Sequence, residues 1–180
     1  MFNRLIDLFI EFLELFQCFV FVDEFEQGVI LRQGRFHRVV GPGLQWIIPF
    51  GQEDVYTVNV KPEPLYLDLQ SLHTKDDYCG NIQIGIIWRV IDVKAFLIDN
   101  ADTPDMIGML CSGVVSKSYM ASKWTQIRDP GYADTLKAPM NRKVRKRGAE
   151  IDEVVIQDFA SGTANRLWHE GITIDVGHED

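Results

Sequence analysis

The stretch VVGPGLQWIIPF, Val39 to Phe50, places a tight turn directly before an apolar strand. The turn is Gly41-Pro42-Gly43, whose glycines reach backbone conformations that are costly for other residues. Pro49 ends the apolar run because proline has no N–H to donate to a sheet. We therefore predict a strand over residues 44–49, in which alternate side chains share one face. That face carries Leu44, Trp46 and Ile48.

Strand patterns continue on both sides of this stretch. Alternating apolar residues bounded by Gly and Pro predict further strands at residues 28–36, 55–60, 65–69 and 81–90. Strands in succession without intervening helices indicate a curled, mostly antiparallel sheet, so we expect residues 23–93 to form a β-rich lobe. The last strand carries a row of large apolar side chains on one face: Ile82, Ile84, Ile86 and Trp88.

The second half of the chain changes to helical signals. The run Asp102-Thr103-Pro104-Asp105 offers an N-cap followed by Pro at the first helical position. Apolar residues then recur at helical spacing and predict a helix over residues 103–123. After a break at residues 129–131 comes a second helix, which begins soon after the break or only at Pro139.

A glycine ends this second helix and a strand follows it. Gly148 has the position of a helix C-cap, and residues 151–159 alternate like a strand that returns to a sheet. Residues 94–159 are therefore expected to form an α/β lobe. The predicted fold class is α+β, with the β-rich lobe first.

The N-terminal segment Leu5 to Val22 is rich in large apolar residues and is expected to form a helix with three acids on one narrow stripe. A helix of these 18 residues spans about 27 Å, short of the roughly 30 Å hydrocarbon core, and the cost of the acids cancels or exceeds its apolar gain. Lying in the membrane interface, or clustering with other copies, removes that penalty. A helix buried against the following domain is the alternative.

Membrane association of residues 1–22, as a single anchor or an interfacial helix, is the working hypothesis. For Trp46 the alternative is a place in the protein core. The residues expected to contact lipid come from this segment and from the strand after the turn: Leu5, Leu8, Phe9, Phe12, Leu13, Phe16, Phe19, Trp46 and Ile48.

Five motifs occur in order across nearly the whole chain: Glu26-Gln27-Gly28-Val29, Pro42-Gly43-Leu44, Pro49-Phe50, Thr74-Lys75-Asp76 and Gly148 to Asp158. Together they resemble the SPFH or band 7 domain of stomatins, prohibitins and flotillins. The resemblance implies a membrane-anchored scaffold that is not itself an enzyme and assembles side by side into rings or cages. Such assemblies delimit a patch of membrane and often surround membrane proteases or channels.

The resemblance also sets an expectation for the end of the chain. Members of the family usually continue into a long coiled coil rich in Ala and Glu, whereas residues 160–180 are expected to form a short tail without one. Within it, Ile172 to Val176 alternates like a strand that pairs with a neighbouring subunit or with its own sheet. Ile172 and Ile174 are therefore candidate residues of an oligomer interface.

Neither a cofactor site nor a catalytic site is indicated by the sequence. The cluster His73, Asp76, Asp77 and Cys79 could hold a metal, but a turn that leads into the long strand is the better interpretation. A nucleotide-binding glycine loop and a hydrolase motif are both missing. The net charge of −8 argues against a nucleic-acid partner. We therefore expect a protein that is not an enzyme and binds neither metal nor cofactor.

The basic run RKVRKR stands out in this acidic chain. It could be a solvated helix face, a contact with an acidic face of the next subunit, or a site for anionic lipid or nucleic acid. The resemblance to ring-forming proteins favours the contact between subunits. The candidate interface residues in the run are Arg142, Lys143, Arg145, Lys146 and Arg147.

Together these features predict a membrane-associated homo-oligomeric scaffold. Its partners would be further copies of itself, the lipid bilayer and the membrane proteins that it encloses. The alternative is an adaptor or inhibitor that binds one membrane protease or another host membrane protein.

Overall fold

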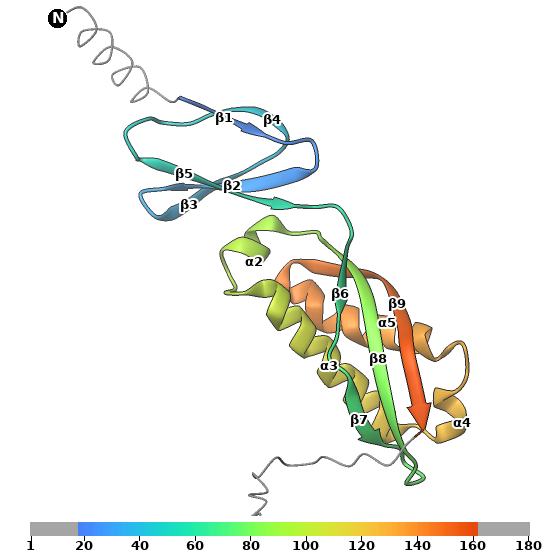
Figure 1. The fold of residues 1–180 in the computed structure, drawn as a ribbon. Helices are drawn as coiled ribbons and strands as arrows, with labels where there is room; N and C mark the ends of the chain where they lie inside the picture. Colours follow the sequence, from blue (N-terminus) through green and yellow to red (C-terminus); the bar gives the residue numbers. More distant parts are fainter. Residues whose placement is uncertain (1–17, 162–180) are drawn as a thin grey trace, which may run out of the picture.

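The computed structural model describes residues 18–161, and its first lobe consists of two small antiparallel sheets (Figure 1). Strand β1 pairs with β4 in a two-stranded ribbon, and the second sheet has the order β3-β2-β5. The apolar core of this lobe is formed by Val22, Ile30 and Val40, with Ile47 and Val55 packed against it. The strands are β1 (Phe19–Val22), β2 (Glu26–Arg32), β3 (Arg35–Val40), β4 (Gly43–Trp46) and β5 (Glu53–Asn59).

The start of this lobe differs from the sequence prediction. Phe19–Val22 was predicted as the end of a helix, but it is strand β1. The reason is tertiary: β1 pairs with β4 over its whole length, and this register places Val22 in the core. A short apolar run suits a helix or a strand equally, so the partner strand decides. The rest of the predicted helix, residues 5–17, lies outside the described residues.

Two other strands of the first lobe have different limits from those predicted. Residues 28–36 are not one strand, because the chain reverses at Gln33 and Gly34, both at positive φ, and so makes the β2–β3 hairpin. The strand after the Gly-Pro-Gly turn ends at Trp46 instead of residue 49. Ile48 lies beyond it, and its N–H donates to the carboxylate of Glu53 at 2.9 Å.

The second lobe has a sheet built around one long strand, β8 (Cys79–Val90). One edge of β8 pairs with β6 (Glu63–Tyr66) and β7 (Gln70–His73), and the other edge pairs with β9 (Ala149–Ser161), all antiparallel. The predicted strand at 65–69 therefore overlaps β6 only at residues 65 and 66, and the chain leaves the sheet at 67–69 before β7 begins. The apolar row that was predicted on β8 is confirmed, because its members are all buried: Ile82, Ile84, Ile86 and Trp88.

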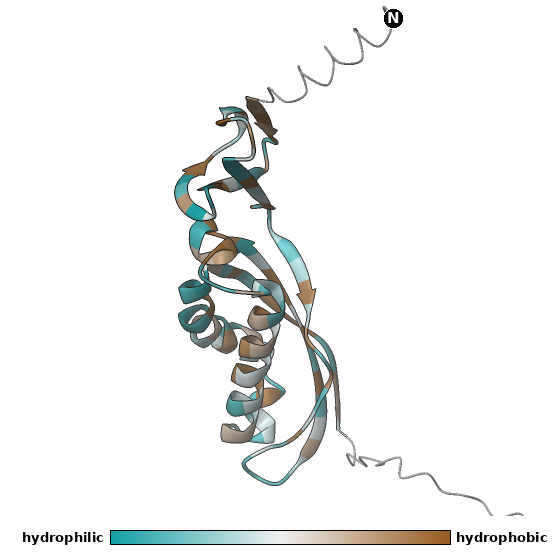
Figure 2. Ribbon diagram, turned by 90° about the vertical axis from the view of Figure 1, so that its left-hand side faces the viewer, coloured by the Kyte–Doolittle hydropathy of each residue, from teal (hydrophilic) through white to brown (hydrophobic). Residues whose placement is uncertain are grey.

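Helices cover one face of this sheet (Figure 2). They are α2 (Val93–Leu97), α3 (Thr103–Ala121), α4 (Trp124–Ile127), α5 (Tyr132–Val144) and the 3-10 turn η1 (Arg145–Arg147). The predicted α+β class with antiparallel sheets is thus confirmed. Within the described range, none of the helices has the length and apolar character needed to cross a bilayer.

The structure confirms α3 to within two residues of its predicted end and starts α5 directly after the break, one of the two predicted positions, but the expected side-chain cap of α3 is not formed. Asp102 makes no side-chain cap bond and has a left-handed backbone, and the hydroxyl of Thr103 donates to the carbonyl of Phe96 instead. Helix α5 begins at Tyr132, so Pro139 lies inside it. A stripe of buried side chains at helical spacing accounts for this, because its packing offsets the hydrogen bond lost at proline. The stripe is Tyr132, Leu136, Met140 and Val144.

Gly148 ends the helical layer, as predicted, with a left-handed backbone at φ 80. Its carbonyl accepts hydrogen bonds from the N–H groups of Ile91 and Asp92, at 2.8 and 3.1 Å. A Cβ at this position would overlap the carbonyl oxygen of Asp92 and lie 2.9 Å from the backbone nitrogen of Phe96. This close approach joins the start of β9 to α2, and α2 in turn contacts β2 and β5 of the first lobe.

Candidate functional site

One face of the β1–β4 ribbon is made entirely of large apolar side chains. In the antiparallel register Phe19 lies opposite Trp46 and Phe21 lies opposite Leu44. The rings of Phe19 and Trp46 meet edge to face, with centroids 4.8 Å apart. We call these four residues the ribbon face. Their exposed fractions are 49% for Phe19, 78% for Phe21, 54% for Leu44 and 61% for Trp46.

The ribbon face is exposed because the strand alternation turns the other side of β1 inward. Val20 and Val22 point to that other side, and Val22 is buried in the lobe core. The ribbon lies at the end of the molecule farthest from the helices, and β1 follows directly after the apolar N-terminal segment (Figure 1). A contiguous apolar surface of this kind marks a contact with a membrane or a protein. Covering it would contribute about 4–7 kcal/mol.

Polar contacts hold the edge of the ribbon face in place. The guanidinium of Arg38 donates to the carbonyl of Trp46 at 2.7 Å, at the end of β4. Behind it, the buried carboxylate of Glu53 accepts from the N–H of Ile48 and from Arg32, both at 2.9 Å. The hydrogen bond from Ile48 holds the pKa of Glu53 below its usual value, although burial opposes this, and Arg32 lowers the pKa further. The loop after β4 is therefore anchored to the core of the lobe.

The structure brings together some of the predicted lipid-contact residues and separates others. Phe19 and Trp46 are direct neighbours on the ribbon face, whereas Ile48 is half-buried in the loop beyond β4. Phe21 and Leu44 were missing from the predicted set. If FVFV had been interpreted as a strand that pairs with β4, its alternation would have placed Phe21 on the same face as Phe19. The remaining predicted contacts, Leu5, Leu8, Phe9, Phe12, Leu13 and Phe16, lie outside the described residues.

The predicted basic run lies at the end of α5 and in η1. Two of its cations are engaged within the chain: Arg145 forms an ion pair with Glu150, and Arg147 donates to the side-chain oxygen of Asn100. Glu150 also binds Arg89 at 3.1 Å. Hydrogen bonds from these two arginines hold the pKa of Glu150 below its usual value, and Arg145 has the larger effect. Three cations of the run make no side-chain hydrogen bond or ion pair with any residue in the range 18–161, namely Arg142, Lys143 and Lys146.

The family profile described as the SPFH domain / Band 7 family matches residues 20–116, a little over half of the 180 residues. The chain belongs to this family. The matched region of this SPFH domain begins in β1 and extends into α3, so it includes Phe21, Leu44 and Trp46 of the ribbon face. The predicted resemblance is thereby confirmed.

Similar proteins occur in bacteria and archaea. The SPFH chain is 34% identical to Protein HflK of Vibrio cholerae over 89 residues, which are 48% of this chain and 22% of the relative. It is 37% identical to a stomatin homolog of Pyrococcus horikoshii over 75 residues, 41% of this chain and 28% of the relative. An uncharacterized protein of Methanocaldococcus jannaschii is 31% identical over 86 residues, 48% of this chain and 43% of the relative. The match thus spans less than half the length of each relative.

The cluster at residues 73–79 forms the predicted turn into β8. Thr74 is buried, and its hydroxyl donates to Asp76 at 2.6 Å and accepts from the N–H of Tyr78 at 3.0 Å. Asp76 in turn accepts from the N–H of Trp124 at 3.0 Å, which fixes the start of α4. The hydrogen bond from Thr74 holds the pKa of Asp76 below its usual value. Among residues 18–161 no group of His, Cys, Asp or Glu side chains is arranged to hold a metal ion.

Proposed function

We propose that this SPFH protein is a membrane-associated, homo-oligomeric scaffold and not an enzyme. The ribbon face and the apolar N-terminal segment lie against the bilayer. Copies then associate through the second lobe into a ring or cage that organises a membrane patch or encloses membrane proteins. The observation that carries this proposal is the ribbon face, because four large apolar side chains are presented outward beside the most apolar segment of the chain.

Geometry and multivalency make such a scaffold effective. One copy gains about 4–7 kcal/mol when its ribbon face is covered, which supports only modest membrane binding by itself. Copies that are linked side by side bring many such faces to the same surface, so the combined binding becomes much tighter without new contacts. A closed assembly then includes or excludes neighbouring proteins by size. The lipid bilayer and further copies of the chain are therefore the proposed partners.

Flotation with lipid vesicles tests the membrane contact. The full chain should float with the vesicles, and a chain that begins at Cys18 should float more weakly because it retains only the ribbon face. A chain that begins at Asp23 is the control, since it lacks β1 and cannot form the ribbon. Recovery of the full chain in the soluble fraction would contradict the membrane contact.

The mass of the particle extracted in mild detergent tests the assembly. A scaffold should give a particle that contains many copies of the chain. A monomer or small oligomer that co-purifies with one membrane protease would instead favour the alternative function, an adaptor or inhibitor. A monomer without any partner would contradict both proposals.

A further inference from the structure

Positive charge in this acidic chain is concentrated on the α3–α5 side of the second lobe. Residues 117–147 contain nine Lys or Arg against two acids, a net charge of +7 in a chain whose total is −8. Most of these cations are exposed. A strong local charge of this sign attracts an acidic partner and orients it.

A groove of about 400 Å³ lies between α3 and α5 within this basic region. Its floor is apolar, formed by Val114, Ala121 and Pro139. Its rim carries three exposed cations, and within residues 18–161 none of them forms a hydrogen bond or ion pair. The rim cations are Lys117, Arg142 and Lys143. An apolar floor with a cationic rim fits a segment that combines apolar and acidic side chains. We call it the basic groove.

The segment that joins α2 to α3 and continues into the first two turns of α3, residues 98–109, has the complementary chemistry. It contains three exposed acids, Asp99, Asp102 and Asp105, and no Lys or Arg. Beside them two apolar side chains are exposed, Met109 at 69% and Ile98 at 37%. We call this segment the acidic turn.

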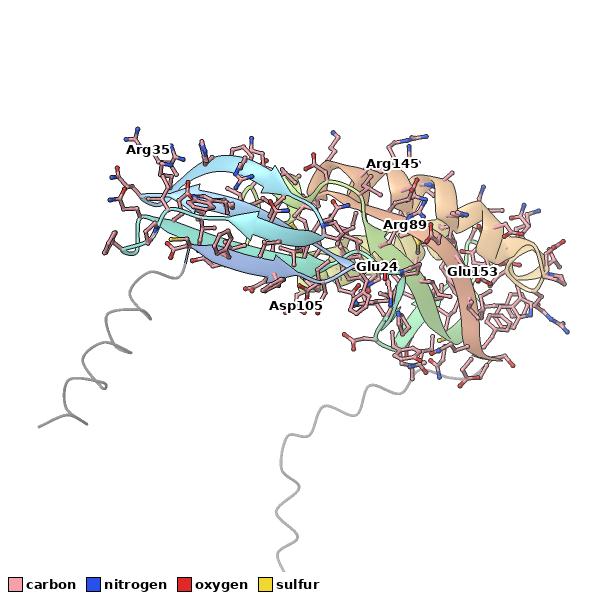
Figure 3. The ribbon with its side chains drawn as sticks, turned by 90° about the horizontal axis from the view of Figure 1, so that it is seen from above. Glu24, Arg35, Arg89, Asp105, Arg145 and Glu153 are labelled. Carbon is pink, nitrogen blue, oxygen red and sulfur yellow. The ribbon has the colours of Figure 1, made fainter. Side chains whose placement is uncertain are left out.

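The acidic turn cannot enter the basic groove of its own chain. Asp105 and Lys117 belong to the same helix α3, where 12 residues separate them by about 18 Å along the axis and about 120° around it. Viewed from above, Asp105 and Arg145 lie on opposite sides of the molecule (Figure 3). Two complementary surfaces on opposite sides of one copy allow successive copies to join head to tail. Such contacts generate a ring when the rotation from one copy to the next closes on itself.

We propose that the basic groove of one copy receives the acidic turn of the next copy, so that Asp99 and Asp105 face Arg142, Lys143 and Lys117. Met109 of the second copy covers the apolar floor. This inference rests on the proposed scaffold function and names the surface through which its copies join. The membrane assists the contact, because anchored copies meet at a high local concentration.

A charge-swap experiment on the full chain tests this contact. Either reversal alone should abolish the large particle, because like charges would then meet at every contact. The reversals in the groove and in the turn leave both cores intact, since all five side chains are exposed. The groove variant is Lys117→Glu, Arg142→Glu and Lys143→Glu, and the turn variant is Asp99→Lys and Asp105→Lys.

Co-expression of the two variants should restore the large particle. In an alternating assembly each reversed groove meets a reversed turn, and each native groove meets a native turn. Persistence of the large particle in either single variant, or failure of the mixture to restore it, would overturn the proposed contact. A matched control reverses three exposed cations that do not line the groove and should leave the particle unchanged: Arg35→Glu, Lys75→Glu and Arg128→Glu.

The particle mass of the wild-type chain distinguishes a failure of this inference from a failure of the proposed function. If the wild-type chain is a large particle and the variants retain it, the contact is wrong while the scaffold stands. If the groove variant keeps its particle mass but loses vesicle binding, the groove binds lipid and the contact is again wrong. Circular dichroism verifies folding, and a neutral variant, Arg142→Gln with Lys143→Gln, should also lose large particles if the reversed variant does not fold.

Discussion

Replacing Phe21 and Trp46 together with serine removes the two most exposed side chains of the ribbon face. Phe21 is 78% exposed and Trp46 is 61% exposed, so most of each side chain is available to be covered by lipid. Full burial of such a side chain contributes about 1.5–3 kcal/mol, and these exposed fractions therefore correspond to about 2–4 kcal/mol for the pair. This predicts vesicle binding that is weaker by roughly 30-fold to 1000-fold.

The measurement is best made on a chain that begins at Cys18, so that the apolar N-terminal segment does not mask the loss. Binding is followed by sedimentation with vesicles over a range of lipid concentrations. Folding should be almost unaffected, because neither side chain belongs to the core of the first lobe. The matched control is Tyr66→Ser with Leu69→Ser, two residues of the second lobe that are 63% and 55% exposed. Equal loss of binding in both double variants, or no loss in either, would refute the ribbon face as the lipid contact.

Two further predictions concern stability. Gly148→Ala should lower the free energy of unfolding by about 3 kcal/mol, because the added Cβ would overlap the carbonyl oxygen of Asp92. Gly34→Ala, at a similar φ of 75 but in open space, should lower it by only about 1 kcal/mol. Urea unfolding compares the two variants, and equal losses would contradict the close approach at Gly148. The folded-state pKa of Glu53 lies below its ordinary value of 4.5, so its stabilising effect is complete above that pH and is lost as the pH falls through the folded pKa. Glu53→Gln should therefore be less stable than the wild type at neutral pH and lose less stability on acidification; parallel pH profiles of unfolding would show that the carboxylate has no such role.

Much of the architecture could be predicted because local patterns and tertiary structure agree there. The apolar row of β8 alternates with period two and is buried on one face. Gly148 follows a basic helix end and has the left-handed backbone that glycine favours. The motifs around Glu26, Pro42 and Thr74 have the order typical of the SPFH family, and the family match includes all of them.

The sequence left a question open where a local signal had two solutions. Pro139 allowed two helix starts, and the buried stripe of α5 decides for the start at Tyr132, directly after the break. The basic run was evident from composition, yet the sequence could not show that Arg145 pairs with Glu150 across the turn into β9. Only the remaining cations of the run are available to a partner.

The sequence by itself therefore determined the family, the order of strands before helices and the presence of an apolar N-terminal segment, because these depend on motif order and local periodicity. Tertiary structure alone decided what the end of that segment does. FVFV is compatible with a helix or a strand, and pairing with Gly43–Trp46 makes it β1. This pairing buries Val22 and turns Phe19 and Phe21 outward beside Leu44 and Trp46. The candidate membrane contact exists because two strands that are distant in the sequence meet in one register.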